Sequence, residues 1–315
     1  MNTRNLFKEL TAYRNALPIE YGSSCFCRVI TSRLDLLRVM ITGPDGSPYA
    51  NGCFFFDINL PASYPAVAPK VQFLTTGGGK IRFNPNLYNC GKVCLSLLGT
   101  WQGPGWISGQ STLLQVLISI QSLILVPDPY FNEPGWEASR GTQRGDTMSK
   151  QYNSRIREHT IDAAIKSHLT SILNKSNPYP EFEGIMIKHF LEKRYLIERE
   201  LKAWAKEDTR LWRQVESVLD LFKCLAAREK EARRGASRSK PSSAFAAAKK
   251  TSSTEPVELD LDDSDDEEVT YLPLAAVGKS EEDAIKIDLC EDDVECQETT
   301  KSAAKSGADD VVDLT

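Results

Sequence analysis

The fold of this chain is decided by the stretch RFNPNLYNCGKVCLSLLGTW, which occupies residues 82–101. It lies inside a longer segment, Thr75–Gly109, that is rich in Gly, Asn and Pro and follows no helical or strand periodicity. Loops of this length inside a folded domain are usually functional. Two cysteines, Cys90 and Cys94, lie within it, so the first candidate for chemistry is a thiol.

The residues before this loop predict one helix followed by four strands. Asn5–Ala16 places its apolar side chains on one helical face, and Gly43-Pro44-Asp45-Gly46 is a strong turn signal. β-branched, aromatic and alternating apolar residues predict strands at Cys25–Thr31, Asp35–Thr42, Gly52–Leu60 and Lys70–Leu74. Because the connections are short, we expect an antiparallel meander.

The residues after the loop predict helices. Gln110–Val126 is expected to form a helix capped by Ser108 and ended by Pro127. Its apolar run is too short to cross a membrane and is interrupted by Gln and Ser, so it predicts a buried helix. Three further helices are expected at Ser149–Leu173, Glu181–Lys206 and Thr209–Arg234. The pattern as a whole predicts an α+β fold.

The charge of the chain is divided unequally along its length. Residues 254–315 hold 21 acidic residues and 4 lysines, whereas the rest holds 22 acidic and 34 basic residues. From Gly235 onward, Ser, Ala, Lys and then Asp and Glu dominate, a composition that buries too little apolar area to offset the entropy of ordering. We therefore expect a core at 1–160, a helical extension at 161–234, and a disordered linker with an acidic tail at 235–315.

The N-terminus and the cysteines indicate the compartment. Met1–Leu10 is charged and lacks the apolar stretch of a signal peptide, so we expect a nuclear or cytoplasmic protein with reduced thiols and no membrane partner. The eight cysteines show no CxxC spacing and only three histidines are present, so we expect no metal. No bound cofactor is expected either.

Residues 82–101 resemble the active-site region of the ubiquitin-conjugating enzyme family. That family has a His-Pro-Asn tripeptide, a Gly, a Cys followed by Leu, and then a Trp; here the tripeptide begins with Asn84. Tyr64-Pro65 matches a family motif before the last strand, and the order of predicted elements agrees. Leu117–Val126 and Pro129–Gly135 are most similar to the branch that contains the conjugating domain of the giant inhibitor-of-apoptosis protein BRUCE (apollon) and its larger relatives. The resemblance implies the family's fold and, for Asn84, a loop-stabilising role.

The same resemblance implies the chemistry. Cys94 would carry ubiquitin or a ubiquitin-like protein as a thioester, because a thiolate accepts an acyl group and releases it readily to an amine. Asn86 would donate a hydrogen bond to the oxyanion, or would hold the loop rigid, or both. Glu133 would orient or deprotonate the incoming lysine, or would simply cap its loop. Cys90 is the nearest rival to Cys94, but it precedes the Gly and lacks the Leu that follows the family's cysteine.

The partners implied are the modifier, an activating enzyme that uses the ATP, and a ubiquitin ligase. A second class of function stays open, namely a non-catalytic scaffold of this fold that only binds ubiquitin or SUMO. Such variants lack the cysteine, and Cys94 is present.

The acidic tail repeats an apolar-Asp-Leu pattern three times. Its apolar positions are Val257, Leu259 and Leu261, then Ile285, Ile287 and Leu289, then Val311, Val312 and Leu314. These segments resemble SUMO-interacting motifs, which add a β-strand to the partner's sheet while nearby carboxylates pair with its basic rim. The alternative is a solvating acidic tail with chance apolar residues. We therefore expect SUMO or poly-SUMO conjugates as further partners that direct the enzyme to its substrates.

Overall fold

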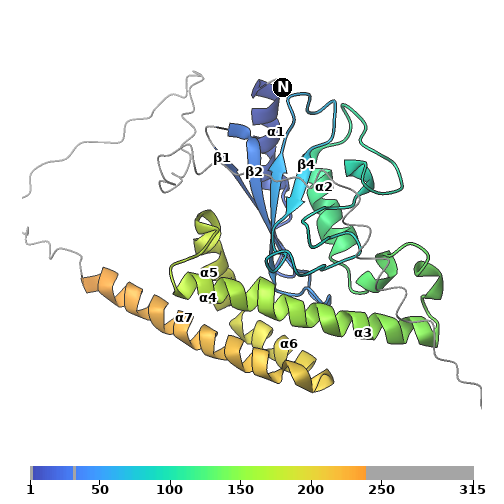
Figure 1. Cartoon of the computed structure of the whole chain (residues 1–315). Helices are drawn as coiled ribbons and strands as arrows, with labels where there is room; N and C mark the ends of the chain where they lie inside the picture. The colour runs from blue at the N-terminus through green and yellow to red at the C-terminus, as the bar shows by residue number, and fades with distance from the viewer. Residues whose placement is uncertain (1–2, 31–32, 239–315) are drawn as a thin grey trace, which may run out of the picture.

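The computed structural model describes residues 3–30 and 33–238, and in this part of the chain an antiparallel sheet lies between two groups of helices (Figure 1). The sheet order is β1-β2-β3-β4, so the predicted meander is confirmed. Its strands are β1 (Cys25–Ile30), β2 (Arg33–Thr42), β3 (Cys53–Asn59) and β4 (Lys70–Phe73). The N-terminal helix α1 spans Thr3–Ala16, and the α+β fold is confirmed as well.

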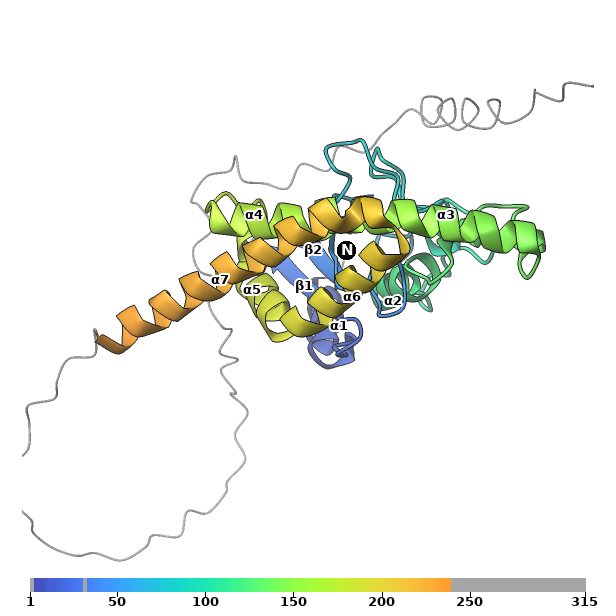
Figure 2. The same ribbon diagram turned by 90° about the horizontal axis from the view of Figure 1, so that it is seen from below.

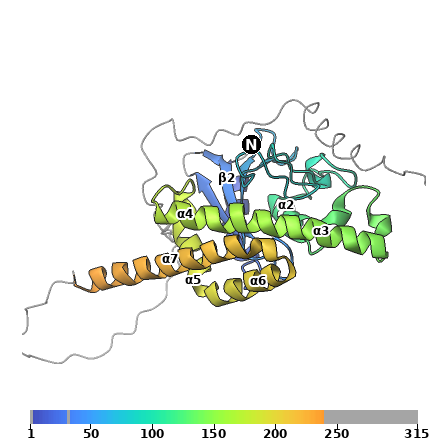
Figure 3. The same cartoon turned by 60° about the horizontal axis from the view of Figure 1, so that its bottom comes forward.

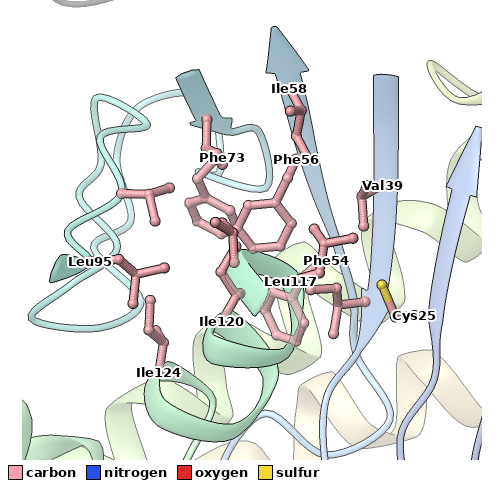
Figure 4. Packing of buried hydrophobic residues seen from close by; sticks show 14 of the residues in the cluster. Cys25, Val39, Phe54, Phe56, Ile58, Phe73, Leu95, Leu117, Ile120 and Ile124 are labelled. Carbon is pink, nitrogen blue, oxygen red and sulfur yellow. The ribbon is translucent and has the colours of Figure 1, made fainter. Parts of the chain in front are cut away.

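Strand β3 is buried on both of its faces. Phe54 and Phe56 contribute to a core that includes Leu117 of α2 (Leu113–Ser119) and Ile120, the residue that follows this helix (Figure 4). Phe55, whose side chain points to the other face of the sheet, belongs to a second core built with the helices after residue 160. The alternation in the sequence predicted only one buried face, because periodicity says nothing about what covers the opposite face.

Helix α2 (Leu113–Ser119) starts three residues later than predicted. Thr112 is the N-cap: its hydroxyl accepts a hydrogen bond from the Gln115 amide, and the Gln115 side chain accepts one from the Thr112 amide. This capping box satisfies two N–H groups at the helix end, so the predicted cap at Ser108 is wrong. A π-helical turn, Ile120–Ile124, continues α2 toward the active-site loop.

A long helical run crosses residue 160, where we expected the core to end. It consists of α3 (Gln143–His159), a π-helical segment (Thr160–Lys166) and α4 (Ser167–Leu173). Helix α3 begins six residues earlier than predicted because the Thr142 hydroxyl accepts a hydrogen bond from the Gly145 amide at 3.0 Å. The π-helical segment is buried against the sheet layer.

Three further helices complete the layer on this side of the sheet (Figures 2 and 3). They are α5 (Glu183–Glu192), α6 (Arg194–Glu207) and α7 (Trp212–Arg238). The prediction of a single helix over 181–206 is wrong, because the helix is interrupted at Lys193, where φ is −91° and ψ is 3°. Helix α7 extends four residues past its predicted end. The three tail motifs lie outside the described residues.

The segment between α4 and α5 lies directly on the outer face of the sheet. The ring of Tyr179 stacks on Phe55 with centroids 3.7 Å apart. Arg38 on β2 binds Asp57 on β3 (Nε–Oδ1 2.6 Å) and Glu181 (Nη1–Oε1 3.2 Å). The helices after residue 160 are therefore part of the same packed unit as the sheet.

Candidate active site

Cys94 lies on the irregular loop between β4 and α2, and its backbone is tied to Asn86. The Cys94 amide donates to the Asn86 carbonyl, and the Asn86 side-chain Nδ2 donates back to the Cys94 carbonyl, both at 2.9 Å. The neighbours Val93 and Leu95 are buried in the core that packs against α2. Cys94 is therefore held at a fixed position at the edge of the core, with 3% of its surface exposed.

The side chain of Asn86 stabilises the backbone of the active-site loop. One of its two N–H bonds serves the Cys94 carbonyl, so the amide stiffens the loop. The geometry fits the loop-holding interpretation of this residue and leaves the second N–H for another acceptor. Sequence reasoning had left both roles open, and the oxyanion role stays a prediction.

Asn84 is the centre of a buried hydrogen-bond network. Its Nδ2 donates to the Tyr49 hydroxyl (2.9 Å) and to the Ile124 carbonyl (2.7 Å), and its Oδ1 accepts from the Asn86 amide (2.8 Å). The Tyr49 hydroxyl donates in turn to the Phe83 carbonyl. Ile124 ends the π-helical turn, so this turn sets the position of one acceptor. Asn84 thus occupies a loop-stabilising position, and the part played by Tyr49 was not foreseen.

Glu133 lies on the loop after α2 and makes an ion pair that the sequence did not suggest. Its Oε2 is 3.3 Å from Nη2 of Arg82, which also donates to the Pro85 carbonyl at 2.8 Å. The guanidinium lies over the ring of Tyr88, 4.3 Å from the centroid. Burial raises the pKa of Tyr88; Arg82 opposes this shift, and the charges of Cys94 and Glu133 add to it. All three groups therefore lie within electrostatic range of one phenol.

Asp128, the other acid near this loop, is engaged elsewhere. It accepts from the Ser149 hydroxyl at 3.1 Å and lies 3.6 Å from Nη1 of Arg140. The guanidinium of Arg140 lies over the ring of Phe131. Asp128 therefore fixes α3 to this loop, whereas Glu133 faces the segment that carries Asn86.

Three of the other described cysteines lie on strands of the sheet. Burial raises the pKa of the Cys25 and Cys53 thiols well above the ordinary value and that of Cys27 to about 12. Such thiols are poor nucleophiles at neutral pH. Cys90 lies on the active-site loop, and its carbonyl accepts from the Gln72 side chain.

Within residues 3–30 and 33–238, no group of three or more His, Cys, Asp or Glu side chains is arranged to hold a metal ion. None of the described helices combines the length and the apolar character needed to cross a bilayer.

The fold and the loop together define an α+β domain that carries a hydrogen-bonded cysteine on the loop between β4 and α2. The sequence model of the family described as "Ubiquitin-conjugating enzyme" matches residues 8–160, which include α1, the sheet, the Cys94 loop and α2. Residues 8–160 are thus a domain of the ubiquitin-conjugating enzyme family, and the predicted resemblance is confirmed.

Curated relatives extend the similarity past the matched domain. A "Probable ubiquitin-conjugating enzyme protein 17" of Caenorhabditis elegans is 47% identical over 205 residues, covering 64% of this chain and 27% of that protein. The human "Dual E2 ubiquitin-conjugating enzyme/E3 ubiquitin-protein ligase BIRC6" is 47% identical over 204 residues, covering 64% of this chain and 4% of that protein. A "Putative ubiquitin-conjugating enzyme E2 38" of Arabidopsis thaliana is 40% identical over 206 residues, which are 64% of this chain and 60% of that protein.

The chain thus spans less than two thirds of the length of each of these relatives. The shared segment covers 64% of 315 residues, which is more than the first 160. The similarity therefore continues into the helices after residue 160.

Proposed function

We propose that Cys94 accepts ubiquitin, or a related modifier, from an activating enzyme and passes it to a substrate lysine. The Cys94 thiolate attacks the thioester of the activating enzyme and displaces the thiolate of that enzyme. The lysine amine then displaces the sulfur of Cys94 and forms an isopeptide bond. ATP is consumed by the activating enzyme, so this chain needs no bound cofactor. The observation that carries the proposal is the position of Cys94, tied by two hydrogen bonds to Asn86 inside a domain of this family.

The test is a charging reaction with activating enzyme, ATP and ubiquitin, read on a non-reducing gel. We expect a thiol-sensitive adduct that Cys94→Ala abolishes. Cys90→Ala is the matched control, because it removes a thiol from the same loop and should still be charged. If neither ubiquitin nor a related modifier forms an adduct, the chain is a binding scaffold instead.

We also assign the free N–H of the Asn86 amide to the oxyanion that forms when the amine attacks. The support is its proximity, since the same amide already binds the carbonyl of Cys94. Loss of one such donor slows acyl transfer by about 10²–10³-fold. We therefore expect Asn86→Ala to slow discharge of a preformed thioester to free lysine by this factor, with Asn89→Ala as the control. Equal discharge rates would refute the oxyanion role.

The three tail motifs support a finer proposal, that the enzyme acts on proteins already modified by SUMO. Each motif has the apolar spacing of a strand that adds to a sheet edge, and the acidic residues around it suit a basic partner. Two stretches of about 20 residues separate the motifs, and unstructured chains of this length span roughly 25 Å, so one tail can engage neighbouring units of a chain. SUMO conjugates in the nucleus or cytoplasm would then be partners, besides the activating enzyme and a ubiquitin ligase.

A pull-down with poly-SUMO tests the tail. A variant with Leu259, Leu261, Ile287, Leu289, Val312 and Leu314 replaced by Ala should lose binding, whereas a variant with Ala at Leu272 and Leu274, which lie in the same tail outside the motifs, should keep it. Poly-SUMO binding that survives the sixfold change would exclude the SUMO proposal and leave the charging reaction untouched.

A further inference from the structure

Arg82 joins three parts of the active-site region, although nothing in the sequence singled it out. Its Nη2 donates to the Pro85 carbonyl at 2.8 Å and lies 3.3 Å from the Glu133 carboxylate. Its guanidinium plane covers the ring of Tyr88. The first contact holds the turn that carries Asn86, the second holds the loop after α2, and the third holds the segment leading to Cys94.

The side chain of Arg82 is partly buried, which strengthens these contacts. The side chains of Arg82 and Glu133 are 28% and 31% exposed, so the pair is partly shielded from water. The Nε atom of Arg82 is buried without a hydrogen-bond partner. A side chain that leaves a buried donor unused is kept in place by its other contacts, because an unsatisfied donor opposes burial.

A guanidinium suits this place better than an ammonium. It is flat enough to stack on a ring while its N–H groups still donate in the plane, whereas an ammonium is a strongly hydrated point charge. An approaching lysine ammonium would therefore meet a Glu133 carboxylate that Arg82 holds at a fixed position and that can take its proton.

We propose that Arg82 is a positioning residue of the transfer step, holding the Glu133 carboxylate in register with the loop that carries Asn86 and Cys94. The proposal rests on the proposed function of Cys94. Glu133 takes one proton from the lysine ammonium, and the neutral nitrogen attacks the thioester carbon. The C–N bond forms, the C–S bond breaks, and of the two hydrogens left on nitrogen one goes as a proton to the departing sulfur of Cys94 while the other stays on the isopeptide nitrogen. Arg82 acts through Glu133 and touches none of the reacting atoms.

The experiment measures discharge of the preformed thioester to free lysine in a single turnover, across pH and lysine concentration. Arg82→Gln should be charged normally but should discharge at least tenfold more slowly, with its pH–rate profile shifted to higher pH. Arg82→Lys should discharge at a rate between that of the parent protein and that of Arg82→Gln. Arg140→Gln is the matched control: it removes a guanidinium that also stacks on a ring and pairs with an acid of the same loop, and it should discharge like the parent.

The double variant Arg82→Gln/Glu133→Gln separates positioning from general damage to the loop. If Arg82 acts through Glu133, the double variant discharges at the rate of Glu133→Gln alone. Additive losses, parental discharge by Arg82→Gln, or parental discharge by Glu133→Gln would each overturn the inference. If Arg82→Gln does not fold, as judged by circular dichroism, Arg82→Lys is compared with Glu133→Gln in its place. Failure of the parent to be charged would contradict the proposed function instead.

Discussion

Asn84 carries much of the rigidity of the active-site loop at the scale of single residues. It is fully buried and satisfies the Tyr49 hydroxyl, the Ile124 carbonyl and the Asn86 amide at once. Asn84→Ala would leave the Asn86 amide buried without a partner, which costs about 1–3 kcal/mol. The Tyr49 hydroxyl and the Ile124 carbonyl would each lose one hydrogen bond, worth about 1 kcal/mol, but would keep the Phe83 carbonyl and the Val126 amide as partners. We expect a loss of several kcal/mol in the free energy of unfolding, measured by urea denaturation, together with slower charging. Asn132→Ala, which removes an exposed amide from the neighbouring loop, is the control and should change stability by less than about 1 kcal/mol.

Sequence reasoning named Glu133 but missed its contact with Arg82 and the contact of Arg82 with Tyr88. Arg82, Tyr88 and Glu133 meet only because the loop before Cys94 and the loop after α2 fold against each other. No local pattern relates positions 51 residues apart, so Arg82 was read as an ordinary residue of the stretch at 82–101. Cys94 and Asn86 could be proposed because their neighbours along the chain resemble a family motif.

At the scale of elements, the active-site loop depends on a glycine beside β4. Gly91 has φ +89°, and a Cβ there would lie 2.1 Å from the Gln72 side chain and 2.7 Å from the Phe73 carbonyl. Gly78 also has a positive φ but open space around it. Both Gly→Ala changes incur the left-handed strain of about 1–2 kcal/mol, and only Gly91→Ala adds a clash with backbone. We expect the urea concentration at the midpoint of unfolding to be clearly lower for Gly91→Ala than for Gly78→Ala. Equal midpoints would show that the loop rearranges to accommodate the added methyl group.

Two histidines attach the extension to the start of β3. Nε2 of His168 on α4 lies 3.0 Å from the Cys53 carbonyl, and Nε2 of His189 on α5 lies 3.0 Å from the Asn51 carbonyl. Burial lowers the pKa of each histidine to about 4. The unfolded chain takes up these protons near pH 6.5, whereas the folded chain takes them up only near pH 4. Stability therefore falls as the pH drops through this window.

The expected loss is roughly 3 kcal/mol for each histidine between pH 6.5 and 4. Urea denaturation at intervals of pH should show it, and His168→Gln/His189→Gln should flatten the curve in this window only. If the free energy of unfolding of the double variant falls with decreasing pH as steeply as that of the parent protein, other groups, such as carboxylates, account for the loss.

The ends of helices and strands were predicted best where one local sequence signal, such as a turn, has no rival nearby. Strand β4 and the C-terminal end of β2 end within a residue of their predicted positions, because turn residues bound strongly apolar runs. The start of α2 was misplaced since Thr112 competes with Ser108 as the cap and can form the reciprocal bonds with Gln115. Such choices depend on side-chain geometry that the spacing of residues does not contain.

For the whole molecule, the sheet is the middle of three layers, and the layer after residue 160 is required by the sequence of β3. Met40, Cys53 and Phe55 are fully buried beneath helices of the extension. Burial of each large apolar side chain contributes about 1.5–3 kcal/mol, so exposing Met40 and Phe55 alone would remove about 3–6 kcal/mol, a large part of the usual net stability of a domain, about 5–15 kcal/mol. The extension therefore belongs to the folding unit, although the family model ends at residue 160.

Truncation tests this arrangement directly. A chain that ends at Lys175 keeps the family domain and loses α5, α6 and α7, whereas a chain that ends at Arg238 loses only the residues beyond the described helices. We expect the shorter chain to unfold at a much lower temperature and to bind an apolar dye, and the longer one to melt like the full protein, both followed by circular dichroism. Charging of Cys94 should fail in the shorter chain as its fold is lost. If the two truncated chains have the same melting temperature, the sheet face that carries Phe55 does not need the helices α5, α6 and α7 for stability. The extension would then have its role in binding a partner.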